Sequence, residues 1–60
     1  MELKDAMIRY RAEKNLSQTD LAELCKVSLQ TINAVENGKQ TPSKLTEAKI
    51  QNVISGGGLD

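Results

Sequence analysis

Two amide side chains, Gln30 and Asn33, are the residues best suited to recognise another molecule by hydrogen bonding. They stand three positions apart, a spacing that places two side chains on one face of a helix. An amide group both donates and accepts, so each can form paired hydrogen bonds with a suitable partner. Ser28, Leu29 and Ala34 are expected on the same outward side. This set predicts a recognition surface of mixed amide and apolar character.

Catalytic chemistry is not indicated by the remaining residues. The 60 residues contain no histidine and one cysteine, Cys25, and no nucleophile stands in a pattern with a base. Covalent and acid–base catalysis need such pairs, and a Cys/His zinc site needs more ligands than this chain holds. The glycines at 56–58 follow the last expected helix, so they do not form a phosphate-binding turn between a strand and a helix. We therefore expect no enzyme, no metal site and no cofactor.

Length and composition limit the class of protein further. Sixty residues support one small domain, and the single cysteine excludes a disulfide scaffold. The apolar runs are too short to span a membrane, and residues 1–10 do not resemble a signal peptide. A free thiol without an export signal predicts a reducing, cytoplasmic location. Eight basic and eight acidic residues give a net charge of zero, which by itself argues against nucleic acid as a partner.

The elements that must position the outward residues are helices. Leu3, Met7 and Tyr10 have the spacing of an amphipathic stripe, and Asn15 can end that first helix. No segment alternates with a period of two, so no sheet is expected. Serine caps predict three further helices, over about 18–25, 28–37 and 43–54. We expect a domain over 1–55, with its central pair of helices in 18–37, and a flexible glycine-rich tail over 56–60.

A common core is predicted from the apolar stripes of these helices. Ala22 is expected where the second and third helices cross, because a larger side chain there would separate them. Leu45 and Ala48 are included among the apolar residues of the last helix. Cys25 and Val27 are expected as apolar anchors of the turn. The expected core residues are Leu3, Met7, Tyr10, Leu21, Ile32, Val35, Ile50, Val53 and Ile54.

Two short helices joined by a tight turn, with polar residues outward on the second, form a helix-turn-helix arrangement. The segment 16–43 resembles the Cro/CI-type domains of phage repressors and the XRE family of bacterial regulators. The matching elements are L-S-Q at 16–18, L-A at 21–22, V-S at 27–28, Ile32, E-N-G-K at 36–39 and P-S at 42–43. The resemblance covers about residues 3–54. It implies an all-α, compact four- to five-helix bundle of the lambda-repressor-like type.

The chain departs from the family pattern at two places. Lys26 stands in the turn where the family usually has glycine, and a left-handed backbone there would carry strain of about 1 kcal/mol. The family usually has a fifth helix, often used for dimerisation. The sequence ends at Asp60 after the glycines, so we expect that helix to be missing or only begun.

The resemblance implies a recognition helix that lies in the major groove with its N-terminal residues against the base edges. Gln30 and Asn33 would bond to adenine, while Leu29 and Ala34 would contact thymine methyl groups. Ser28 would contribute from the helix start. Because no arginine or lysine lies between residues 28 and 35, the commonest guanine contact is absent. We therefore expect a half-site rich in A/T pairs.

The phosphate contacts are also carried over from the family. Its glutamine at the start of the second helix and its Asn-Gly-Lys element grip the DNA backbone, and Gln18, Asn37 and Lys39 correspond. Ser17 and Ser28 would assist through the amide groups of their helix starts. Thr31 and Lys44 are weaker candidates. Such contacts position the domain without reading sequence.

Arg11 and Glu36 correspond to an ion pair of the resembling repressors. In those proteins the pair joins the first helix to the end of the recognition helix. We expect it to be half-buried and structural, so that losing one partner costs on the order of 3 kcal/mol.

The distribution of charge moderates the argument from net charge. Between residues 26 and 52 there are four lysines, Lys26, Lys39, Lys44 and Lys49, against Glu36 and Glu47. Most of the other acids lie on the first two expected helices. A net charge of zero is therefore compatible with a modestly positive surface toward DNA.

Two functions remain open at this stage. The first is a transcription regulator, expected to be a repressor, that binds a palindromic operator in double-stranded DNA as a homodimer. The second is a protein-interaction module such as an antitoxin component, with a protein partner on the apolar side of the last helix. Salt-dependent binding to a duplex distinguishes the two.

Overall fold

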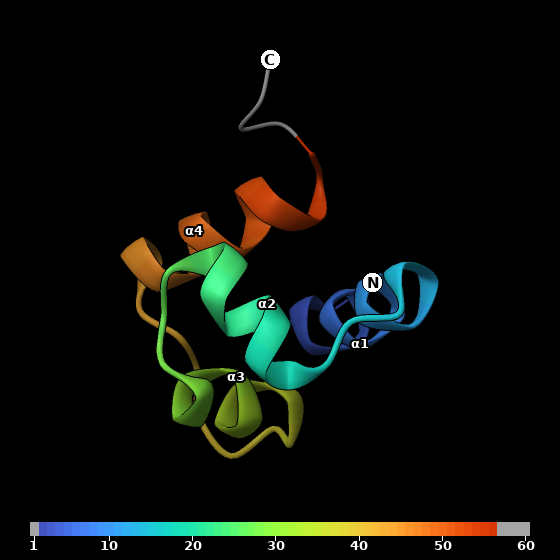
Figure 1. Cartoon of the computed structure of the whole chain (residues 1–60). Helices are drawn as coiled ribbons and strands as arrows, with labels where there is room; N and C mark the ends of the chain where they lie inside the picture. The colour runs from blue at the N-terminus through green and yellow to red at the C-terminus, as the bar shows by residue number, and fades with distance from the viewer. Residues whose placement is uncertain (1, 57–60) are drawn as a thin grey trace.

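The computed structural model describes residues 2–56 and places four helices there: α1 (Leu3–Lys14), α2 (Gln18–Cys25), α3 (Leu29–Glu36) and α4 (Lys44–Ile54). In Figure 1, α2 crosses the middle of the bundle, with α3 and α4 on opposite sides of it. No strand occurs in the described part of the chain. The all-α expectation is therefore confirmed. Of the tail predicted over 56–60, only Gly56 lies among the described residues.

Serine side chains cap the starts of α2, α3 and α4, as predicted. Ser17, Ser28 and Ser43 each accept a hydrogen bond from the backbone N–H three positions later, at 3.0–3.2 Å. The carboxylate of Asp20 accepts in return from the backbone N–H of Ser17 at 3.1 Å. Caps of this kind each stabilise a helix by about 1 kcal/mol. Helices as short as α2 and α3 therefore begin at defined residues.

Left-handed residues end the first three helices. Asn15 has a φ of 58° and Lys26 a φ of 59°, while Gly38 follows α3 with a φ of 72°. The turn between α2 and α3 is closed by the backbone N–H of Val27, which donates to the carbonyl of Ala22 at 3.0 Å. The strained conformation expected at Lys26 is thus present, and it directs the chain from α2 into α3.

Strain at this turn predicts that glycine is more stable than alanine at position 26, the reverse of their order inside a helix. We expect Lys26→Gly to be more stable than Lys26→Ala by about 0.5–1 kcal/mol, because only glycine adopts a left-handed conformation without cost. At Glu23, which lies inside α2, alanine should be more stable than glycine by about 0.8–1 kcal/mol. Urea unfolding of the four variants measures both differences. The same ranking at both positions would contradict the argument.

The core lies where the four helices meet. Met7, Leu21, Ile32 and Ile50, one from each helix, are completely buried. Ala22, the small residue of α2, is only 4% exposed and belongs to the same core. Around this centre pack the partly buried residues Leu3, Tyr10, Val27, Val53 and Ile54.

Two apolar residues of α4 lie outside the core. Leu45 is 69% exposed, and Ala48 is also exposed. At about 100° per residue, they point roughly 140° and 160° away from Ile50 around the helix. α4 buries only the stripe that continues from Ile50 to Val53 and Ile54, so its opposite side faces solvent.

The thiol of Cys25 is buried in the core, and this burial raises its pKa above the ordinary value. A raised pKa in the folded state stabilises the fold below the unfolded thiol's pKa, and this contribution is lost as pH rises through the folded value. We expect the free energy of unfolding to fall above about pH 8.5. Thermal melts between pH 7 and 10 test this, and the Cys25→Ala variant should show a shallower decline.

No helix in residues 2–56 combines the length and the apolar composition needed to cross a membrane.

Candidate nucleic-acid interface

α3 has one buried side and one solvent side. Ile32, Val35 and Glu36 are buried, whereas the residues expected at base edges lie on the other side. Ser28, Leu29, Gln30 and Asn33 are exposed, and Ala34 is partly buried. Leu29 exposes 46% of its surface, although it is a large apolar residue. The helix therefore presents the predicted mixture of amide and apolar groups to solvent.

The hydroxyl groups at the two helix starts are used within the chain. The Oγ of Ser28 accepts from the backbone of Thr31 and lies 2.8 Å from the Oγ1 of Thr31. The Oγ of Ser17 caps α2 in the same way. These side chains thus act first as caps, and Thr31, which is partly buried, has little free surface. Contacts from this region to an anion would come mainly from backbone N–H groups.

A chain of hydrogen bonds joins four side chains whose roles the sequence alone suggested separately. The Nδ2 of Asn37 donates to Asn33 Oδ1 at 3.0 Å, and the Nδ2 of Asn33 donates to Gln18 Oε1 at 3.2 Å. The Nε2 of Gln18 in turn donates to Glu36 Oε1 at 3.0 Å. Only the Asn33–Asn37 spacing of four residues could have suggested a contact. The others depend on how α2 packs against α3.

Arg11 and Glu36 form a two-pronged ion pair. The Nε of Arg11 donates to Oε2 and the Nη2 donates to Oε1 of the carboxylate, both at 2.8 Å. The Glu36 side chain is only 3% exposed, and this hydrogen-bonded carboxylate raises the pKa of Arg11. Arg11 also donates to the carbonyl of Leu16 at 3.3 Å. Because Gln18 bonds the same carboxylate, Glu36 joins α1, α2 and α3 at one point.

Three of the predicted contact residues have side chains without a partner in residues 2–56. Gln30, Lys39 and Lys44 are exposed, and none of their side chains makes a hydrogen bond or an ion pair there. Lys39 lies in the loop after α3, and Lys44 is the first residue of α4. These groups are free to bind an external partner without first breaking an internal bond.

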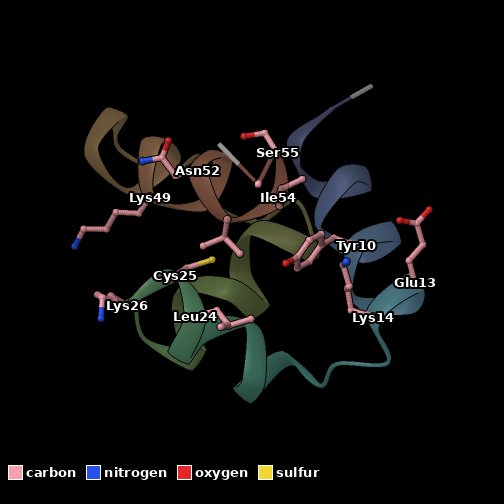
Figure 2. Close-up of a pocket in the computed structure, with 12 residues that line it drawn as sticks. Tyr10, Glu13, Lys14, Leu24, Cys25, Lys26, Lys49, Asn52, Ile54 and Ser55 are labelled. Atoms are coloured by element: carbon pink, nitrogen blue, oxygen red, sulfur yellow. The ribbon is translucent and has the colours of Figure 1, made fainter. Parts of the chain in front are cut away.

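The structure separates the four lysines that sequence order had grouped together. Lys39 and Lys44 belong to the segment that follows α3, but Lys26 and Lys49 line a groove between α1, α2 and α4 (Figure 2). No α3 residue lines that groove. In the described part of the chain, no group of three acidic or thiol side chains could hold a metal ion.

A capped helix leads through a strained turn into a second helix whose outer side carries amide groups. This geometry defines a helix-turn-helix domain, the class whose second helix reads DNA in the major groove. Residues 7–54 match the sequence pattern of the Helix-turn-helix family. The chain belongs to this family and is a DNA-binding transcription regulator.

Individual relatives support the assignment. The chain is 48% identical over 48 residues to an uncharacterised HTH-type transcriptional regulator of Methanocaldococcus jannaschii. The aligned segment covers 80% of this chain and 73% of that protein. It is 36% identical over 53 residues to multiprotein-bridging factor 1b of Arabidopsis thaliana, and 32% identical over the same length to factor 1a. These matches cover 88% of this chain but only 37% of each plant protein. No solved structure matches the chain.

Proposed function

We propose that the domain reads a DNA sequence by placing the exposed side of α3 in the major groove. The observation that carries this proposal is Gln30, an exposed amide with no partner in residues 2–56. Gln30 and Asn33 would bond to adenine, and Leu29 and Ala34 would pack on thymine methyl groups. Ser28 would contribute at the start of the helix. The preferred half-site is therefore rich in A/T pairs.

Phosphate contacts would hold the domain beside the groove. The exposed ammonium groups of Lys39 and Lys44 are the strongest candidates, and the exposed amide of Asn37 is a further one. The Gln18 side chain keeps its hydrogen bonds to Glu36 and Asn33. Gln18 would therefore orient these two side chains and also contact a phosphate. Ser17 and Thr31 would act through backbone N–H groups in the first turns of α2 and α3.

The role of Lys39 gives a quantitative prediction. We expect Lys39→Ala to weaken binding to all duplexes by a similar factor and to reduce the slope of log K against log salt by about one. The reason is that one fewer phosphate is neutralised. Fluorescence anisotropy with specific and unrelated duplexes at several salt concentrations measures both quantities. An affinity change confined to one sequence would instead indicate that Lys39 contacts a base.

Two domains acting together are required for useful affinity. Six or fewer phosphate contacts and one short helix give one copy a small interface. We therefore propose a homodimer on a palindromic operator, with half-sites about one helical turn apart. Blocking a promoter in this way makes the protein a repressor that acts in the cytoplasm, with no catalytic step and no cofactor.

A selection from random duplexes tests the proposal. The expected result is enrichment of A/T-rich, two-fold symmetric sites, with a steep loss of affinity as salt increases. Sedimentation with and without a selected duplex should show two protein chains on each DNA. Enrichment of G/C-rich sites would contradict the assigned readout, and absence of binding at low salt would contradict DNA binding by this domain.

A protein-interaction module is the second candidate. Several relatives are multiprotein-bridging factors of Arabidopsis thaliana, and an antitoxin component would use the same fold. The free amide and lysines around α3 favour the DNA proposal over this one, because a module that binds only proteins has no need for them there.

A further inference from the structure

A groove with an apolar floor lies between α1, α2 and α4, outside the surface assigned to DNA. Its volume is about 840 Å³, within the range of sites that bind ligands or peptide side chains. Tyr10, Leu24, Val53 and Ile54 contribute apolar surface, and Cys25 lies at its base. Leu24 is 50% exposed. An apolar site of this size on so small a domain favours an interaction surface.

The rim of the groove is positively charged. Lys26 and Lys49 lie near each other at one end, while Lys14 lies toward the other end beside Tyr10 (Figure 2). The ammonium of Lys14 is 5.8 Å from the centre of the Tyr10 ring. The one acid on the lining, Glu13, pairs with Arg9 at 3.1 Å and points outward in Figure 2. Three lysines therefore surround an apolar floor.

The dipoles of the surrounding helices do not make the rim of the groove negative. The C-terminal ends of α1, α2 and α4 meet at the groove and carry partial negative charges of about half a unit each. However, one or two carbonyls in the last turn of each helix accept hydrogen bonds from the capping N–H groups of Asn15, Lys26 and Ser55. The full charges on the lysines extend beyond these capped ends toward solvent. A partner that enters the groove meets a cationic rim.

We propose that this groove binds an amphipathic helix of a protein partner whose polar side is acidic. An apolar stripe would fill the floor beside Leu24 and Val53, and carboxylates at helical spacing would face the rim lysines. Helix-in-groove binding of this kind uses anchors at i, i+3, i+4 and i+7. Because no α3 residue lines the groove, the partner and a DNA duplex bind at the same time.

A second copy of this chain fits the groove less well. A symmetric dimer places the same patch of each copy against the other. The lysine-rimmed patch of one copy would then face the same patch of the other, and opposed like charges oppose association. Complementary charge therefore favours an acidic partner over self-association.

The test uses a designed amphipathic peptide of about 18 residues, five helical turns, built from leucine and glutamate and without aromatic residues. Tyr10 is the only aromatic residue of the chain, so its fluorescence reports occupancy of the groove. We expect saturable binding that weakens with salt and is unaffected by saturating operator duplex. A matched peptide with lysine in place of glutamate should bind at least ten-fold more weakly.

Matched variants locate the site. Lys26→Glu together with Lys49→Glu should reduce peptide affinity at least ten-fold, whereas Lys39→Glu with Lys44→Glu should leave it unchanged. For the floor, Leu24→Ser should weaken binding, and Ile8→Ser, at an exposed α1 residue outside the groove, should not. Leu24 and Ile8 are both partly solvent-exposed, and circular dichroism verifies that each variant remains folded.

Several outcomes would overturn the proposal. Equal loss in the groove and DNA-side lysine variants would mean non-specific attraction, and equal binding of the lysine peptide would remove the charge argument. Binding only after truncation beyond Gly56 would assign the groove to the chain's own last residues. Binding of decanoate but not of the peptide would indicate a small-molecule site. DNA affinity of the groove variants is measured separately, so failure here leaves the DNA proposal intact.

Discussion

Replacing Arg11 with alanine is expected to lower the free energy of unfolding by about 3 kcal/mol. The carboxylate of Glu36 is almost completely buried and would retain only the hydrogen bond from Gln18. A buried charge that loses its partner costs far more than an exposed pair contributes. For a domain of this length, total stability is roughly 3–9 kcal/mol, so this single change removes a large fraction of it.

The measurement is thermal and urea unfolding followed by circular dichroism. The melting temperature should fall by roughly 12–24 °C. Arg9→Ala provides the matched control, because Arg9 lies on the same helix and pairs with Glu13, but both of those side chains are more than half exposed. That variant should lose no more than about 0.5 kcal/mol. Equal losses in the two variants would refute a structural role specific to Arg11.

The Arg11 variant also separates stability from recognition. At a temperature where the variant remains folded, it should bind operator sequences in the same order of affinity as the original chain. The reason is that Arg11 lies on α1 and not on the DNA-facing side of α3. A changed ranking would show that the ion pair orients α3 in the groove as well as holding it in the fold.

Replacing Gln30 with alanine should weaken DNA recognition and leave the stability of the fold almost unchanged, the reverse of the effect of Arg11→Ala. We expect affinity for the preferred duplex to fall roughly 5- to 150-fold, the effect of one lost paired contact to adenine. Binding to unrelated duplexes should remain unchanged. Because the Gln30 side chain makes no hydrogen bond in residues 2–56, the free energy of unfolding should change by no more than about 0.5 kcal/mol.

Two variants control the Gln30 experiment. Asn33→Ala should reduce both affinity and stability, since the Asn33 amide also bonds to Gln18 and Asn37. Gln51→Ala, at an exposed glutamine of α4, should change neither quantity. Anisotropy titrations with selected and base-substituted duplexes measure affinity and sequence preference. If Gln30→Ala weakens all duplexes equally, Gln30 does not read a base.

Local signals in the sequence predicted most of the helical elements. The serine caps, Asn15 and the Asn37–Gly38 pair act within four or five residues of where they stand, so their effects follow from spacing alone. The apolar residues of α4 show where local signals stop. Leu45 and Ala48 are apolar but exposed, because the apolar character of a residue does not determine which side of its helix packs against the core. The packing of α4 through Ile50 decided that.

The sequence by itself determined the four helices, the central turn with its strained Lys26, and which residues of α3 are outward. These depend on short-range hydrogen bonds and on helical periodicity, which the order of residues contains. Only the tertiary structure decided that Gln18, Asn33 and Asn37 share one hydrogen-bonded chain ending at Glu36. It also separated Lys26 and Lys49 from the other lysines and placed them on the groove. Such contacts join residues far apart in the chain, and their geometry exists only once the helices have packed.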